Sequence, residues 1–184
     1  MPDEAVKLMH QADRARREHR LADAERDLSA AVGLLRANGA RRELAQALKK
    51  LAQVKRDLGP SDAVRPLYEE AVSIYREEGS ALDLAHTIRH LGDVYRHEGQ
   101  AKLAEDCYLE ALALYRNQET TPALDLANAI RPLAILRDDV GEVEEAQRLW
   151  EEARVLYALV HVQAGVEESS ARLARLGQRR KSAE

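Results

Sequence analysis

The stretch ALDLAHTIRHLGDVYRHEG at residues 81–99 decides the fold, because it returns in altered form as ALDLANAIRPLAILRDDVG at residues 123–141. Within the first copy Leu84, Ile88 and Leu91 lie four and three residues apart, a spacing that places them on one face of a helix. Both copies end in glycine, which commonly follows the last turn of a helix. A second apolar run with helical spacing comes next, so the sequence predicts a unit of two antiparallel helices joined by a short turn.

The composition excludes several classes of protein. Of the 184 residues, 45% are hydrophobic and 4% aromatic, and the apolar residues do not alternate as they would in strands. We therefore expect a single all-α structural unit. No apolar run reaches the roughly 18 to 20 residues of a membrane span, and MPDEAVKLMH lacks the apolar stretch of a secretory signal. Because the single cysteine cannot form an internal disulfide, a cytoplasmic location is expected.

The helix pair occurs four times along the chain. Its apolar first-helix position recurs every 40 to 42 residues, at Leu8, Leu48, Ile88 and Ile130. A small residue stands about one turn later, at Ala12, Ala52, Gly92 and Ala134. A large residue recurs on the second helix, at Leu28, Tyr68, Tyr108 and Trp150. Small residues let helices approach and large ones fill the groove beside them, so the units are predicted to stack. The predicted repeat array covers residues 1–160, with repeats at about 5–40, 45–80, 85–120 and 127–160.

The third unit resembles a tetratricopeptide repeat (TPR). The residues that match the motif are Leu91, Gly92, Tyr95, Gly99, Ala104, Tyr108 and Ala111. The period exceeds the usual 34 residues and is similar to the longer repeats of kinesin light chains and of Pins/LGN-type scaffolds. The resemblance implies a right-handed α-solenoid of four helix-turn-helix repeats whose first helices line a concave groove. In the first unit His19 stands where the turn glycine is expected.

The C-terminal segment GVEESSARLARLGQRR repeats the first-helix pattern with Leu173 and Leu176, but no second helix follows it. Each unit of a stacked array leaves one apolar face uncovered. We therefore expect residues 161–184 to form a capping helix with a basic tail. The alternative is that this segment packs on a second copy of the chain.

By the same resemblance, first-helix side chains between the packing positions line a peptide-binding groove. The candidate residues are Met9, Asp13, Arg16, Gln46, Lys49, Lys50, Gln53, Arg56, His86, Arg89, His90, Asp93, Arg96, Asn128, Arg131 and Ile135. With their neighbours Arg17, Asp57, Asp138 and Asp139, the predicted groove carries eight basic and five acidic side chains, whereas the whole chain has a net charge of −4. This contrast favours an acidic ligand. The alternative, that these charges are only the solvated faces of helices, stays open.

Other chemistry is weakly indicated. His86, His90, Asp93 and His97 have a spacing that could present metal ligands, but no second element supplies a matching set, so no metal is expected. With the ordinary histidine pKa of about 6.5, the groove histidines predict that acidification to pH 5.5 adds positive charge. Cys107 has no identifiable base beside it, and no glycine-rich phosphate loop is present. We expect neither a cofactor nor an enzyme.

The leading hypothesis is a non-catalytic protein–protein interaction module that binds an acidic peptide or protein segment in the groove. Neither nucleic acid nor a membrane is expected as a partner, since the chain is acidic overall and its groove lacks stacking aromatics. The alternative is a scaffold that self-associates into a homo-oligomer.

Overall fold

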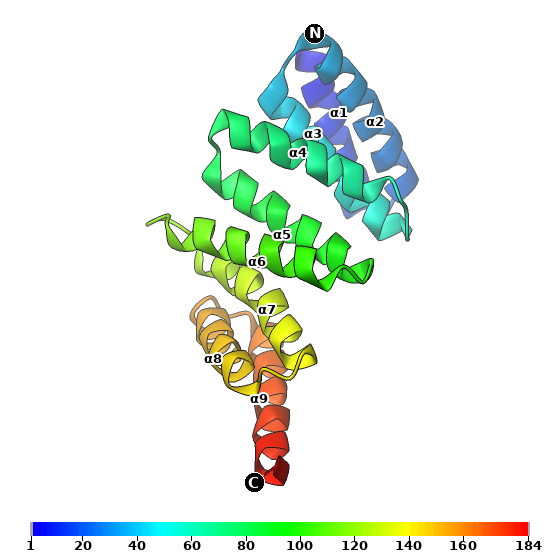
Figure 1. The fold of residues 1–184 in the computed structure, drawn as a ribbon. Helices are drawn as coiled ribbons and strands as arrows, with labels where there is room; N and C mark the ends of the chain where they lie inside the picture. The colour runs from blue at the N-terminus through cyan, green and yellow to red at the C-terminus, as the bar shows by residue number, and fades with distance from the viewer. Residues whose placement is uncertain (1, 184) are drawn as a thin grey trace. The chain divides into compact units, whose positions relative to one another are not determined.

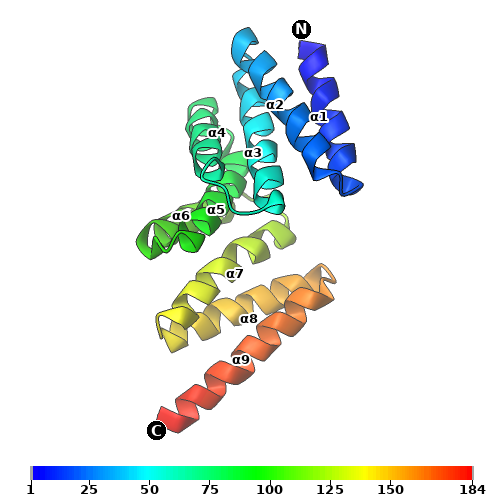
Figure 2. The same cartoon turned by 90° about the vertical axis from the view of Figure 1, so that its right-hand side faces the viewer.

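The computed structural model describes residues 2–183, and the side chains of residues 4–179. That part of the chain is all-α, as predicted, and contains no strand (Figures 1 and 2). Its helices are α1 (Pro2–Arg17), α2 (Leu21–Asn38), α3 (Arg41–Leu58), α4 (Val64–Glu78), α5 (Ala81–His97), α6 (Ala101–Arg116), α7 (Ala123–Asp139), α8 (Val143–Leu159) and α9 (Gln163–Ala183). None of them is both long and apolar enough to cross a membrane.

The turn after α1 adopts the backbone of a glycine turn without a glycine. Gly99 and Gly141 have φ angles of 75° and 81°, the left-handed region that glycine occupies without steric cost. His19 has a φ of 58° at the turn between α1 and α2, and His161 has a φ of 57° between α8 and α9. A non-glycine residue in this region costs about 1 kcal/mol or more. The departure from the TPR pattern at His19 therefore leaves the turn conformation unchanged.

The chain divides into two compact units, Met1–Val94 and Tyr95–Glu184. This differs from the single structural unit that we expected from the composition. The division falls in the last turn of α5. In a helical repeat each element contacts only its neighbours, so a chain of this length need not gather around one centre. In the first unit α2 packs against both α1 and α3, and α3 packs against α4.

The core of the first unit follows the predicted alternation of small and large side chains. Ala12 and Ala52 are buried on the first helices, while Leu28 and Tyr68 are fully buried on the second helices. Because the small residues let the helices approach, the large ones are enclosed on all sides. Gly92 is likewise buried within α5.

In the second unit α7 lies against α6 and α8, and α9 packs along α8. Gly165 of α9 meets the ring of Tyr157 so closely that a Cβ there would lie 2.4 Å from a ring carbon. Leu176 is buried on the same helix, whereas Leu173 is only partly buried. The helix therefore covers the apolar side of the fourth helix pair within its own chain.

Candidate functional site

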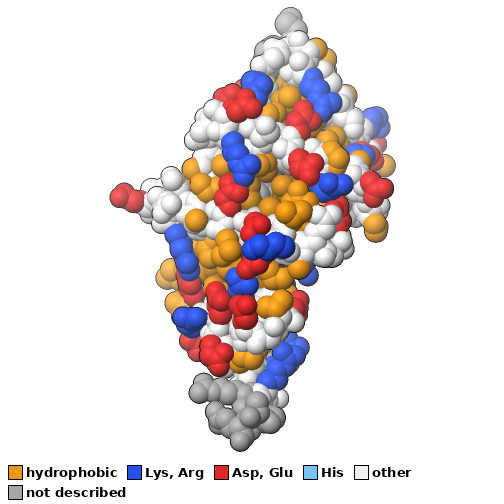
Figure 3. Space-filling view, in the orientation of Figure 1, with side chains coloured by type: hydrophobic (Ala, Val, Ile, Leu, Met, Phe, Trp, Pro, Cys, Tyr) orange, Lys and Arg blue, Asp and Glu red, His pale blue; other side chains and the backbone are white. Residues whose placement is uncertain are grey.

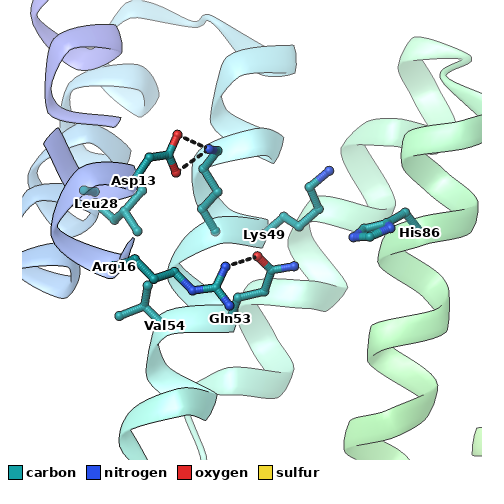
Figure 4. A pocket seen from close by; sticks show the side chains of 9 residues that line it. Asp13, Arg16, Leu28, Lys49, Gln53, Val54 and His86 are labelled. Carbon is teal, nitrogen blue, oxygen red and sulfur yellow. Dashed lines mark hydrogen bonds and ion pairs between the residues drawn. The ribbon is translucent and has the colours of Figure 1, made fainter. Parts of the chain in front are cut away.

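A cavity of about 230 Å³ opens between the first helices of the N-terminal unit. Its walls come from α1, α3 and α5, with one residue from α2, and Figure 4 shows their side chains converging on it. The lining residues are Ala12, Asp13, Arg16, Leu28, Lys49, Lys50, Gln53, Val54 and His86. Six of these belong to the groove predicted from the sequence: Asp13, Arg16, Lys49, Lys50, Gln53 and His86.

Ion pairs between successive first helices organise the charges of the cavity. The Lys50 ammonium lies 2.6 Å from both carboxylate oxygens of Asp13, so this pair links α3 to α1. Arg16 of α1 donates to Asp57 of α3 at 2.8 Å. Figure 3 shows acidic and basic side chains interspersed in the same way over the visible surface. The predicted excess of positive charge is therefore partly neutralised within the fold itself.

Lys49 is held less tightly than Lys50. Its ammonium lies 3.3 Å from Asp83 and 5.6 Å from the centre of the Tyr75 ring, which it faces as a cation–π contact. Asp83 and Asp57 do not line the cavity. The lining consequently holds three cations, Arg16, Lys49 and Lys50, and one carboxylate, Asp13.

His90 lies beside the cavity at the centre of a polar cluster and is 8% exposed. Nη1 of Arg56 is 3.2 Å from its Nδ1, and Nη2 of Arg89 is 2.9 Å from its Nε2. The ring stacks on Tyr68 with the centroids 5.9 Å apart. His86, which lines the cavity, meets the His90 ring edge-on at 4.7 Å between centroids. The cavity and the cluster are therefore contiguous.

Burial keeps both of these histidines neutral. Burial and, to a smaller extent, the neighbouring His90, Arg89 and Lys49 lower the pKa of His86 to about 3. Burial also lowers the pKa of His90 to about 4, against the opposing effect of the hydrogen bond to Asp93. The prediction that acidification to pH 5.5 charges the groove is therefore wrong for His86 and His90. The ordinary pKa applies to a fully solvated ring, whereas His90 is buried and His86 is partly buried.

Besides His90, two apolar residues of the predicted groove are buried, which differs from the expectation that they line an open surface. Met9 is 7% exposed, because the buried stripe of α1 runs through Ala5, Met9 and Ala12. Ile135 is 9% exposed, because α7 is flanked by α6 and α8 and by ion pairs from α9. Neither side chain offers an open apolar contact.

Two other predicted residues, Asn128 and Arg131, are already engaged within the fold. In the second unit Asn128 accepts a hydrogen bond from the Tyr157 hydroxyl at 2.9 Å, and Arg131 pairs with Glu168 at 2.6 Å. Arg96 belongs to the same unit. In the first unit Gln46 is half-buried on α3. These four residues are not among those that line the cavity.

Three kinds of ion-pair partner were not predicted from the sequence. Asp83 pairs with Lys49, Glu168 pairs with Arg131, and arginines of α9 pair with the buried Asp138, at 2.8 Å for Arg179. The sequence separation of the paired residues could have indicated these contacts. The partners are 34, 37 and 41 residues apart, which is one repeat of 40 to 42 residues or up to about two helical turns less.

The other candidate chemistry finds no geometric support in the described residues. No group of three or more His, Cys, Asp or Glu side chains there is arranged to hold a metal ion. Cys107 is a half-buried thiol on α6.

Comparisons with known proteins identify the fold. No protein-family model and no curated protein matches the sequence. Among solved structures, the chain is similar to the nearly identical TPR-like repeats of a kinesin light chain candidate from Podosopora anserina, with a TM-score of 0.76, 18% identity, and coverage of 100% of this chain and 92% of that one. BtubC (BKLC) from P. vanneervenii gives a TM-score of 0.58 at 17% identity over 98% of this chain and 91% of that one. MamA protein gives 0.63 at 17% identity over 100% and 97%. The chain therefore has the fold of TPR-like helical repeats.

Proposed function

We propose that this protein is a non-catalytic interaction module that binds a peptide or protein segment by inserting a carboxylate into the cavity between α1, α3 and α5. One observation carries the proposal: the lining holds three cations and one carboxylate. The cavity, at about 230 Å³, is smaller than the roughly 300 to 1,000 Å³ of typical small-molecule sites. It is suited to a single acidic side chain or a chain terminus.

Lys49 is the side chain best placed to hold the incoming carboxylate. Its contact with Asp83, at 3.3 Å, is longer than the 2.7 to 2.9 Å that is usual for a charge-assisted hydrogen bond. Nη1 of Arg16 likewise makes a long contact of 3.4 Å with Gln53. A ligand carboxylate between these two groups gains short bonds, while the tight pair of Lys50 and Asp13 stays in place. Helical repeats commonly present such extended binding surfaces, which is why the fold supports the proposal.

The test uses fluorescein-labelled octapeptide pools whose central residue is either Glu or Gln, with the other positions degenerate. We expect the fluorescence anisotropy of the Glu pool to rise on titration with the wild-type protein. The rise should be smaller at high salt, because exposed charges are screened. Lys49→Gln is expected to weaken the Glu pool about tenfold, the loss of one charge-assisted bond of roughly 1.4 kcal/mol.

Arg36→Gln is the matched control. Arg36 of α2 also forms an ion pair across repeats, at 2.5 Å from Glu70, but it does not line the cavity. This variant should bind the Glu pool as the wild type does. Equal binding of the Glu and Gln pools, or an equal loss in both variants, would show that the cavity is not a carboxylate site.

The alternative function, a self-associating scaffold, is favoured by one apolar surface on α8. Val155 and Leu159 are one turn apart there and are 63% and 67% exposed. A scaffold that pairs through this surface should show a molar mass in light scattering that rises with concentration, and Leu159→Ser should abolish the rise. A constant monomer mass would eliminate this alternative.

A further inference from the structure

The polar cluster around His90 contains more hydrogen-bond donors than acceptors. A neutral imidazole has one nitrogen that accepts and one that carries a proton. Three donor groups nevertheless face this ring: Arg56 at Nδ1, Arg89 at Nε2, and the Gln53 amide at 3.5 Å from Nε2. One guanidinium must therefore point an N–H group at another N–H group.

The geometry indicates that Arg56 is the mismatched donor. Its partner nitrogen, Nδ1 of His90, is 3.4 Å from Asp93 and is best protonated toward that carboxylate. Nε2 then accepts from Arg89 at 2.9 Å. Arg56 is left facing Nδ1–H, and its side chain is 34% exposed, so it has room to turn toward a ligand.

Asp93 does not satisfy the two arginines. Its Oδ2 lies 3.8 Å from Arg56 and 3.7 Å from Arg89, beyond hydrogen-bond distance for either guanidinium. Two cations thus lie near one carboxylate, and neither is within hydrogen-bond distance of its Oδ2. Such a pair of guanidinium groups suits an anion with several acceptor oxygens better than a single carboxylate.

The cluster adjoins the cavity through two side chains. Gln53 lines the cavity, contacts Arg16 through its oxygen at 3.4 Å, and reaches His90 through its nitrogen. His86 also lines the cavity and touches His90. A segment anchored in the cavity can therefore place its next side chains at Arg56 and Arg89.

We infer that Arg56 and Arg89, supported by His90, form a subsite for a phosphoryl group carried by the bound segment. This rests on the proposed function, because the cavity supplies the anchor. The phosphoryl oxygens would accept from Arg56, which thereby gains the acceptor that His90 denies it, and from Arg89. A phosphoserine or phosphothreonine brings a charge of about −1.5 to −2 and three acceptor oxygens, which matches two guanidinium groups.

The experiment compares octapeptide pools that carry a central Glu and, two positions later, either phosphoserine, Glu or Ser. In anisotropy titrations, the wild-type protein should bind the phosphoserine pool at least tenfold more tightly than it binds the other two pools. Arg56→Lys keeps the charge but loses the planar fork. This variant should lose most of the preference for phosphoserine. Its affinity for the pool with Glu at the second position should stay within twofold of that of the wild type. Arg89→Lys should act in the same direction, and circular dichroism confirms that both variants fold.

Two further measurements serve as controls. Competition with inorganic phosphate distinguishes a free ion from a phosphoryl group carried by a peptide, and a phosphoserine pool with central Gln distinguishes this inference from the proposed function. If inorganic phosphate competes as strongly as the phosphopeptides, the site takes the free ion and a segment-borne group is refuted. If the pools with central Glu bind but phosphoserine does not increase the affinity, this inference fails while the proposed function stands. If phosphoserine binds equally well with central Gln, the cavity anchor fails and the subsite stands alone. If no pool binds, both proposals fail.

Discussion

Lowering the pH from 7.5 to 5.5 should destabilise the protein through His90. The unfolded chain takes up a proton on this side chain below a pKa of about 6.5, whereas burial lowers the pKa of the folded side chain to about 4. The folded state therefore binds fewer protons between these values. The stabilising contribution is fully present above pH 6.5 and is lost progressively as the pH falls toward 4.

The magnitude follows from the width of that window. Each pH unit below 6.5 costs about 1.4 kcal/mol for a histidine that is protonated in the unfolded chain and neutral in the folded one, so His90 lowers the stability by about 1 kcal/mol between pH 7.5 and pH 5.5. Burial lowers the pKa of His86 as well, so this side chain adds a similar amount. Ordinary carboxylates remain ionised in this range. With a denaturant slope of about 2 kcal/mol per molar urea, the two contributions together should lower the unfolding midpoint followed by circular dichroism by about 1 M.

His90→Gln should be less stable than the wild type at pH 7.5 but should lose about 1 kcal/mol less on acidification. His10→Gln is the control, because His10 is an exposed histidine on α1. A His90→Gln variant with the same pH dependence as the wild type would refute the claim that this ring is buried and neutral.

Three further perturbations test the packing. Gly165→Ala places a Cβ against the Tyr157 ring and should destabilise the protein by about 1 to 3 kcal/mol. Gly177→Ala on the same helix meets no atom within 4 Å and should stabilise the protein by about 0.5 to 1 kcal/mol. Thermal unfolding compares the two variants. Gly92→Leu overfills a buried position of α5 and should cost about 1 to 3 kcal/mol or more, and an unchanged urea midpoint would contradict the repeat register. A chain ending at Gln163 lacks α9 and should associate, so a stable monomer in light scattering would show that α9 covers nothing essential.

The apolar spacing along the chain predicts the helices and most of the faces that they bury. The spacing of apolar residues reflects 3.6 residues per turn, which is a property of the backbone, so the pattern identifies each helix before any packing is known. The small and large positions also follow from the sequence, because the same contact recurs in every repeat. Ala52 and Tyr68 are buried as this pattern predicts. Even the turn at His19 keeps the conformation that the repeat requires.

The burial of each groove side chain and the residue with which it pairs depend on how the helices pack together. Periodicity identified His90 and Met9 as members of a helix face, but whether that face is open depends on the neighbouring helices, and both side chains are buried. Charge counting predicted a basic groove, yet Lys50 is paired with Asp13 from another repeat. Burial and ion pairing act over a few ångströms between segments that are dozens of residues apart, so the pKa of His90 and the ion pairs of the cavity cations depend on how the helices pack.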